Sequence, residues 1–384
     1  MEPAILVWAR RSIGYDVPDA AKRIGVSPAR LTDFESGALS PTVTQLRRMA
    51  TTYQRPLGVF FLAEAPQDFD AMHDFRRLPT LGTRDWSPAL HKLFRRVRDQ
   101  VEVADDLLED EGDQPGADLP AIALDAEPEV AAAIGRSALG LSLAEQFAFR
   151  TPEESFAAWA VAVESLGILV LQSSDVDLSE MRGFSISDGP LPAVMINGRD
   201  APRGRTFTLA HEFGHVLLRR SGLCDLHDGG GAPDGDAEVF CNAFAAALLM
   251  PSEAFTREPL VAARSGPQEW DDDELASLSV KYGTSREAVL RRLVTVGRAT
   301  AQFYERRRKE FLQGYEEDRA RRRLSESKGG PGPATMTVRD LGKPYVRLVL
   351  DAYGRRSITA STVADYLGVR LKHLPTITER VRAS

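Results

Sequence analysis

The sequence predicts a mainly α-helical protein with a small antiparallel sheet, an α+β fold. Most of the 384 residues lie in stretches whose apolar residues recur at helical spacing. Only two short apolar runs are typical of strands, Ile168–Leu171 and Val194–Ile196. Proline- and glycine-rich breaks between the helical stretches predict four parts. These are a five-helix domain over residues 1–66, a helical connector over 67–150, a central domain over 151–300, and a charged helix, linker and small helical tail over 301–384.

Composition narrows the class of protein. With 43% apolar residues, the chain can bury more than one core, and its net charge of −7 argues against a general nucleic-acid coat while allowing local basic patches. Two cysteines provide no disulfide framework, which favours a reducing, cytoplasmic compartment. We expect no membrane segment, because no apolar run approaches the length of a bilayer-spanning helix. Arg10 and Arg11 interrupt the first apolar residues, and no cleavage site of a secretory signal follows.

The first domain has the pattern helix, short glycine turn, helix. Turn and cap residues predict five helices, at Ala4–Ser12, at Val17–Ile24, from Pro28 to an end near Glu35–Gly37, at Thr42–Tyr53 and at Pro56–Leu62. Gly25 and Val26 form the turn, Ala21 is the small residue where the second and third helices cross, and Ile24, Leu31 and Phe34 join Val26 in the core. The stretch resembles the helix-turn-helix of the lambda-repressor and Cro type, the XRE family.

That resemblance implies binding to double-stranded DNA, with the third helix in the major groove. It would expose Ser27, Ala29, Arg30, Thr32 and Asp33, of which Arg30 is the best candidate for a base edge. Phosphate contacts are expected from Arg10, Arg11, Lys22, Arg23, Arg47 and Arg48. Asp33 would repel phosphates if it faced outward, and the alternative is a module for protein docking or dimerisation. Proteins with this motif often act as dimers, so a homodimer is expected by analogy.

The segment Asp68–Thr80 is expected to be a connector with His73 at the surface. Helical stretches come after it. One long amphipathic helix is predicted over Trp86–Glu111, and an acidic loop over Glu109–Pro120. Two further helices, Pro128–Leu139 and Thr151–Leu166, lead to the first predicted strand. Antiparallel strands beside a helix would leave an edge on which an extended peptide can pair through its main chain.

The candidate metal-binding and catalytic residues lie in Thr206–Leu218, TFTLAHEFGHVLL. This stretch contains the pattern H-E-x-x-H. On a helix, His211 and His215 project from one face and can share a Zn²⁺ ion. Glu212 then lies beside the metal, where a carboxylate can act as general base toward a water molecule. The alternative is an ordinary buried helix whose two histidines hydrogen-bond to their neighbours.

A third ligand is needed if such a zinc ion is to keep a position for water. Asp236–Pro251 predicts a second apolar helix with Glu238 in its first turn and Asn242 one turn further along the same side, beside the expected metal site. Favourable interaction with the helix N-terminus explains Glu238 equally well from spacing alone. In the intervening glycine-rich loop, we interpret His227 and Cys224 as loop residues rather than ligands.

The two motifs together resemble the ImmA/IrrE family of zinc metallo-endopeptidases. That family pairs H-E-x-x-H with a helix of the form E-x-x-A-N-x-F-A-x-x-L-L-M-P, and GFS at Gly183–Ser185 and PAVMIN at Pro192–Asn197 fit as well. The resemblance spans roughly Thr151–Val296 and implies a zincin-like peptidase domain. By that match His211, His215 and Glu238 would be zinc ligands and Glu212 the general base. Cys241 stands where the family usually has alanine, and it is small enough to pack there.

The family resemblance implies a DNA-associated regulatory peptidase. Known members cleave transcriptional repressors, so the expected substrate is a specific protein such as a repressor. The alternative is a non-proteolytic transcriptional regulator or antitoxin that uses the peptidase-like fold for sensing or docking. Glu212 favours the peptidase, because a scaffold has no evident need for a general base.

The remaining sequence is helical and charged. Asp272–Gly297 is similar to a further helix-turn-helix, although in the ImmA/IrrE family this segment closes the peptidase domain. A charged helix is predicted over Ala299–Glu326 and a linker over Ser327–Ala334. The tail over 336–384 predicts helices at Tyr345–Tyr353 and Thr359–Leu367; it is similar to a small DNA-binding or docking module, and the alternative is a lid packed on the peptidase domain.

Overall fold

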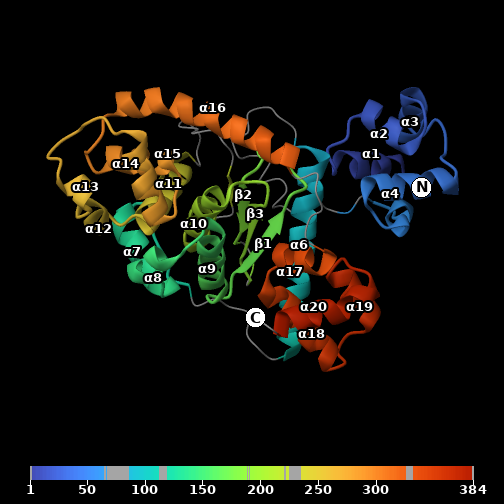
Figure 1. Ribbon diagram of the computed structural model, residues 1–384. Coiled ribbons are helices and arrows are strands. Elements are labelled where there is room, and N and C mark those ends of the chain that lie inside the picture. Colours follow the sequence, from blue (N-terminus) through green and yellow to red (C-terminus); the bar gives the residue numbers. More distant parts are fainter. Residues whose placement is uncertain are drawn as a thin grey trace. The chain divides into compact units, whose positions relative to one another are not determined.

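The chain forms two compact units, residues 1–99 and 100–384, and the long helix α6 (Pro88–Glu111) runs through the division. The computed structural model (Figure 1) describes residues 2–64, 66, 86–111, 119–187, 189, 191–219, 222–224, 235–325 and 332–382. The expected connector at Asp68–Thr80, with His73, and the side chains of Cys224 and His227 lie outside this description. The mainly helical α+β fold is confirmed. The boundaries of the four expected domains remain predictions.

The first unit begins with the helices of the predicted helix-turn-helix. These are α1 (Pro3–Arg11), α2 (Val17–Ile24), α3 (Pro28–Glu35), α4 (Val43–Tyr53) and the 3₁₀ helix η1 (Leu57–Phe61). Gly25 ends α2 with a positive φ of 80°, which a glycine adopts without steric cost, and Ser27 caps α3 by accepting a hydrogen bond from the backbone N–H of Arg30. Ala21, Ile24, Leu31 and Phe34 are all buried, as expected, and Val26 packs against them.

The second unit contains a small mixed sheet. Its strands are β1 (Leu169–Ser173), β2 (Gly183–Ile186), β3 (Ala193–Asn197) and β4 (Gly222–Cys224), in the order β1-β3-β2-β4. The two predicted strands, β1 and β3, pair in parallel, with Val170 opposite Val194. The expected antiparallel pairing of these two strands was wrong because β2 lies between them in the sequence and returns the chain, so β2 takes the antiparallel place beside β3.

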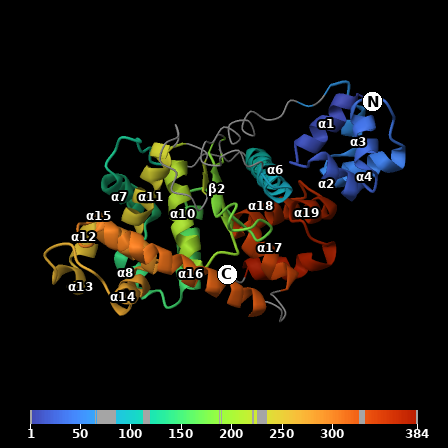
Figure 2. The same ribbon diagram turned by 90° about the horizontal axis from the view of Figure 1, so that it is seen from above.

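Helices surround the sheet. In chain order they are α7 (Pro128–Leu139), α8 (Leu143–Ala148), α9 (Pro152–Glu164), α10 (Pro202–Leu217), α11 (Gly235–Leu249), α12 (Ser252–Thr256), α13 (Pro259–Ala262), α14 (Asp272–Tyr282), α15 (Arg286–Thr295) and α16 (Ala301–Ser325). Figures 1 and 2 show α10 between α11 and the sheet, with α7 on the far side of α11. No helix within these described ranges is long and apolar enough to span a bilayer.

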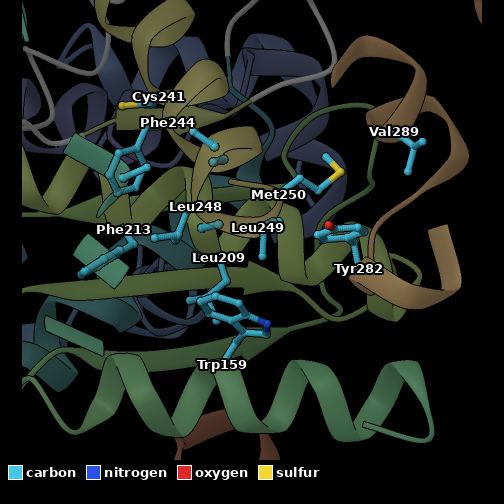
Figure 3. Close-up of a cluster of buried hydrophobic side chains, with 14 of the residues drawn as sticks. Trp159, Leu209, Phe213, Cys241, Phe244, Leu248, Leu249, Met250, Tyr282 and Val289 are labelled. Carbon is cyan, nitrogen blue, oxygen red and sulfur yellow. The ribbon is translucent and has the colours of Figure 1, made fainter. Parts of the chain in front are cut away.

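The main core lies between α10, α11 and their neighbours. Phe213 of α10 and Phe244 of α11 have ring centroids 6.1 Å apart, and Trp159 of α9 and Leu209 extend the same apolar cluster (Figure 3). Gly135 of α7 lets this helix approach closely, since a Cβ there would meet Phe244 at 3.0 Å. The core therefore holds α10 and α11, the two helices of the sequence motifs, in fixed positions relative to each other.

Polar side chains from three other helices secure the buried end of α11. Arg136 Nη1 donates to the carbonyl of Leu248 at 2.8 Å, Gln146 Nε2 to that of Leu249 at 2.9 Å, and Arg292 Nε to that of Met250 at 2.8 Å. The last carbonyls of a helix have no partner within it, and a buried carbonyl without a partner is costly. These three donors therefore fix the position of α11 along its axis.

A C-terminal helical module, residues 332–382, packs on the β1 edge of the sheet. It comprises α17 (Pro333–Leu341), α18 (Lys343–Gly354), α19 (Ala360–Tyr366), the 3₁₀ helix η3 (Leu371–His373) and α20 (Leu374–Arg382). Gln172 of β1 donates to the carbonyl of Arg339 in α17 at 3.1 Å, and Gly342 lies so close to the carbonyl of Val170 that a Cβ would be 2.8 Å from it. The module thus covers the β1 edge, which excludes that edge as a place for an extended peptide.

Candidate metal centre

Helix α10 buries the H-E-x-x-H pattern in the middle of the second unit. His211, Glu212 and His215 are 1%, 0% and 3% exposed, respectively. Pro202 starts the helix, and its apolar residues continue past the motif to Leu217, so the histidines stand on regular helical backbone. The two imidazoles lie one turn apart with ring centroids separated by 4.9 Å. The expected shared face of the two histidines is therefore present.

The first turn of α11 brings Glu238 to this pair. Glu238 Oε2 lies 3.2 Å from His211 Nε2, Glu238 Oε1 lies 3.1 Å from His215 Nε2, and the two Nε2 atoms are 3.1 Å apart. Within the described part of the chain, these three residues form a group able to hold a metal ion. Three donor atoms converge, although they come from two helices.

The spacing of the three donors fits one small dication. Ligands at about 2.0–2.1 Å from a tetrahedral zinc ion lie about 3.3 Å from one another, close to the separations found between His211, His215 and Glu238. The Glu238 side chain is 20% exposed while both histidines are buried, so the site opens toward solvent on the side of the carboxylate. A site of this kind keeps room for water or substrate, as catalytic metal sites require.

The charges favour the metal-binding form of Glu238. Burial raises its pKa, but the hydrogen bonds and charges of His211 and His215 have the larger combined effect and hold that pKa well below its usual range. A deprotonated carboxylate is the form that coordinates a metal. The electrostatics and the donor geometry at Glu238 therefore agree.

Glu212 is placed differently from the three donors. Both of its carboxylate oxygens are buried without a hydrogen-bond partner of ordinary geometry among the described residues. Burial raises its pKa to about 8; the charge of His211 lowers it, that of Glu238 raises it, and the nearby hydroxyl of Ser185 lowers it. A nearby dication would lower the pKa further, because an opposite charge favours the carboxylate. Glu212 is thus a carboxyl group whose protonation depends on the occupant of the site.

Two glycines let other elements approach the motif closely. A Cβ on Gly183 of β2 would lie 2.6 Å from Thr208 Cγ2 and 3.4 Å from Glu212 Cγ. A Cβ on Gly214 of α10 would lie 3.2 Å from Cys241 Sγ in α11. The absent side chains allow β2 and α11 to sit against the two sides of α10. Cys241 is a buried thiol at this contact, as its size permits.

Asn242 lies one turn after Glu238 and is half-buried. The structure records no hydrogen bond of its side chain to any residue it describes, so its expected support of the metal site stays a prediction. The residues that sequence reasoning missed are Gly183, Ser185 and Gly214. Gly183 and Ser185 lie within GFS, the motif that the family resemblance had already singled out, whereas Gly214 carries no local signal of a close approach.

The residues expected to contact DNA lie mostly on the surface of the first unit. Ser27, Ala29, Arg30 and Thr32 are exposed on α3, as are Arg23 of α2 and Arg47 of α4. Arg10 is different: it is 8% exposed, and its guanidinium forms a two-point ion pair with Glu35 at 2.7 and 2.9 Å. The expectation that Arg10 meets a phosphate was therefore wrong, because Arg10 holds α1 against α3. Asp33 is half-buried rather than projecting freely.

Fold and site together define a helix-turn-helix domain joined to a metallopeptidase-type domain. Residues 8–60 match the helix-turn-helix family model, and residues 163–294 match the IrrE N-terminal-like domain. The chain is thus a fusion of an XRE-type helix-turn-helix with an ImmA/IrrE-type domain.

Two curated relatives match part of the chain. The radiation response metalloprotease IrrE of Deinococcus deserti is 45% identical over 67 residues, which are 16% of this chain and 23% of that protein. The protein of the same name from Deinococcus radiodurans is 40% identical over 76 residues, or 18% and 20% of the two chains. The matched segment thus spans about a fifth of each relative.

Proposed function

We propose that this chain is a DNA-associated, zinc-dependent metallo-endopeptidase with a regulatory role. The observation that carries the proposal is the convergence of His211 Nε2, His215 Nε2 and a Glu238 carboxylate oxygen at 3.1–3.2 Å beside the buried carboxyl of Glu212. The two relatives that match part of the chain are named metalloproteases, which supports the same chemistry.

The residues divide into ligands and a general base. His211, His215 and Glu238 would hold the ion. When bound, zinc supplies a Lewis acid that polarises a peptide carbonyl and acidifies a water molecule. Glu212 accepts a proton from the attacking water and delivers it to the leaving amine. Glu212 is fully buried where α10 packs against β2, and this burial excludes bulk water from the proton transfer.

We further propose that the substrate is a specific protein, such as a transcriptional repressor. The helix-turn-helix, with Arg30 exposed on α3, would bring the peptidase to double-stranded DNA, where such a substrate is bound. Since β1 is covered by α17, we place the pairing of an extended substrate strand at β4, the other edge strand of the described sheet. The proposal places the protein in the cytoplasm and is compatible with a homodimer.

Metal content and cleavage test the proposal separately. Wild type and Glu212→Gln should both purify with about one zinc per chain, and His211→Ala should lose it, as measured by elemental mass spectrometry. Comparison of new protein N-termini in cells expressing wild type or Glu212→Gln should show cleavage products with wild type alone. Glu253→Gln, an exposed carboxyl on α12, serves as the matched control.

Two results would contradict the proposal. Full cleavage by Glu212→Gln would remove that residue from the chemistry. Zinc bound without any cleavage product, in a chain that still binds DNA, would favour the non-proteolytic regulator.

A further inference from the structure

Helix–glycine–helix turns recur in the described part of the chain, for example at Gly140 between α7 and α8, and three of them can be aligned with one another. The glycine between the two helices is Gly25 after α2, Gly283 after α14 and Gly368 after α19, with φ of 80°, 67° and 63°. In each case a buried residue directly precedes the glycine, namely Ile24, Tyr282 and Leu367. The first of the three is the helix-turn-helix matched by the family model. The C-terminal module therefore repeats, in α19 and the η3–α20 segment, the turn found in the first domain.

The pattern of burial extends the equivalence beyond the glycine. Val363 in α19 takes the place of Ala20 in α2, and both are fully buried. Ile377 in α20 takes the place of Phe34 in α3, and both are again buried. The two helices of the C-terminal pair thus pack through the same positions as the helices of the first domain. Between these anchors, Ile24 and its counterpart Leu367 are buried as well, whereas Ser27 and Ala29 and their counterparts Arg370 and Lys372 are exposed.

At the turn of Gly283, the helix that corresponds to α3 is α15, and another helix of the same domain covers it. In α15, Glu287 accepts a hydrogen bond from Tyr304 Oη of α16 at 3.3 Å, and the guanidinium of Arg286 lies over the ring of Phe311 at 5.6 Å. Helix α16 therefore lies along the face that would enter a DNA groove, as Figure 1 shows. Helices α14 and α15 are therefore packed within the peptidase domain, as the resemblance to the ImmA/IrrE family implied.

The corresponding face of the C-terminal module is open. Arg370, Lys372 and Thr376 are exposed, and they occupy the places of Ser27, Ala29 and Asp33 in the first domain. Neither Arg370 nor Lys372 has an ion-pair partner among the residues that the structure describes, whereas many cations of the peptidase domain, such as Arg264, are paired. The contact with the sheet is made by α17, and Figure 1 shows α19 on the side of the module away from the sheet.

The charge of the module matches this arrangement. Residues 332–382 contain nine arginines and lysines against four aspartates and glutamates, although the whole chain has a net charge of −7. A cluster of unpaired cations on a helix-turn-helix is the electrostatic feature of DNA binding. We propose that α19, η3 and α20 form a second binding surface for double-stranded DNA, with the η3–α20 segment in the major groove and Arg370 and Lys372 contacting the duplex.

A binding assay with the full-length chain tests this surface. The probe is a random-sequence DNA duplex of about two helical turns, and affinity is measured by fluorescence anisotropy from about 50 to 200 mM KCl. All variants carry Arg30→Ala and Arg47→Ala, to weaken the first helix-turn-helix. Arg370→Ala with Lys372→Ala should then weaken binding at least about ten-fold and reduce the slope of log affinity against log salt by about 2, since each phosphate contact contributes about 0.9.

Matched variants separate DNA contact from general charge and from folding. Arg257→Ala with Lys309→Ala removes two exposed cations elsewhere in the second unit and should leave the slope unchanged. Thr376→Lys adds a cation to the proposed surface and should raise both affinity and slope, a gain that misfolding cannot produce.

Cross-linking locates the contact directly. A bromodeoxyuridine-substituted duplex, irradiated with the full-length wild-type chain, should give cross-linked peptides from residues 360–382. The proposal is overturned if the slope stays unchanged in the Arg370 and Lys372 variant, as expected of a protein-docking surface. Cross-links confined to residues 2–61 would overturn it equally.

Discussion

Gly214 of α10 contacts Cys241 of α11 so closely that a Cβ on the glycine would lie 3.2 Å from the cysteine Sγ. The same Cβ would lie 3.0 Å from Phe244 Cδ1. In α10, Gly214 lies between Glu212 and His215. In α11, Cys241 lies about one turn after Glu238. The distance between the two motif helices, and with it the geometry of the candidate metal centre, depends on the missing side chain.

Gly214→Ala should therefore push α11 away from α10. We expect a loss of about 1–2 kcal/mol in the free energy of unfolding, because overpacking outweighs the gain in helix propensity. Metal affinity should fall as well, since Glu238 moves with α11. Chemical denaturation and zinc titration measure the two effects. The control is Gly314→Ala in α16, where a Cβ meets nothing within 4 Å, so the same change should leave metal affinity unchanged and stabilise slightly.

Removing the metal should destabilise the wild-type chain. A ligand that binds only the folded state stabilises it by mass action, by about 2.7 kcal/mol when its free concentration is 100 times its Kd. Thermal unfolding with and without a chelator should show a lower Tm for the chelated wild type and no shift for Glu238→Ala. Glu253→Ala, a change at an exposed position, should behave as wild type. An equal shift in Glu238→Ala would remove that residue from the ligand set.

The sequence predicted those parts of the site that depend on local spacing. His211, Glu212 and His215 lie within one turn of a helix, so their common face followed from the period of the helix alone. Glu238 was different, because spacing left its role open and only the family resemblance joined it to the histidines. The structure supplies the distances that connect the two helices.

Features that depend on contacts between distant segments could not be predicted. Strand β2 has only four residues, one of them Gly183, so its place in the sheet and the parallel pairing of β1 with β3 had no signal in the sequence. Arg10 appeared as a surface cation because its partner Glu35 lies in another helix. Gln146 gave no sign of its role in securing the end of α11 for the same reason.

Gln146→Ala should destabilise the second unit strongly. Its buried amide donates to the carbonyls of Leu249 and Tyr282 at 2.9 and 3.0 Å and accepts from Arg136 at 2.9 Å. Truncation leaves two buried carbonyls and one nitrogen of the half-buried Arg136 without this partner, which we expect to cost about 2–4 kcal/mol. Urea denaturation measures this loss. The exposed Gln302→Ala should change stability by less than about 0.5 kcal/mol, and an equally small effect at Gln146 would contradict this account of α11.

Arg30→Ala should weaken DNA binding by the first helix-turn-helix. Arg30 is exposed on α3, where it lies over the ring of Phe34 at 5.8 Å, and a base contact of this kind contributes about 1–3 kcal/mol of discrimination. An electrophoretic shift with an operator selected from a random library is the measurement. Arg257→Ala provides a control of equal charge. An unchanged shift and unchanged sequence preference in Arg30→Ala would count against the placement of α3 in the groove.

Glu164 should make stability depend on pH where the C-terminal module meets α9. Burial raises its pKa to about 7, although the charge of Lys343 lowers it, and Gly342 lies against its carboxyl group. Because the folded-state pKa exceeds the unfolded value of 4.5, the folded chain binds the proton more tightly. The stabilisation is complete below about pH 4.5 and is lost as pH rises through 7.

Glu164→Gln should remove this dependence. At pH 8 the variant should be more stable than wild type by about 3 kcal/mol, and the difference should fall below about 1 kcal/mol at pH 5 and vanish at lower pH. Denaturation of both proteins across this range gives the difference directly and cancels contributions from the histidines, which both chains share. Glu253→Gln should follow wild type at every pH. A stability difference between Glu164→Gln and wild type that is constant from pH 5 to 8 would show that Glu164 does not change its charge in this range.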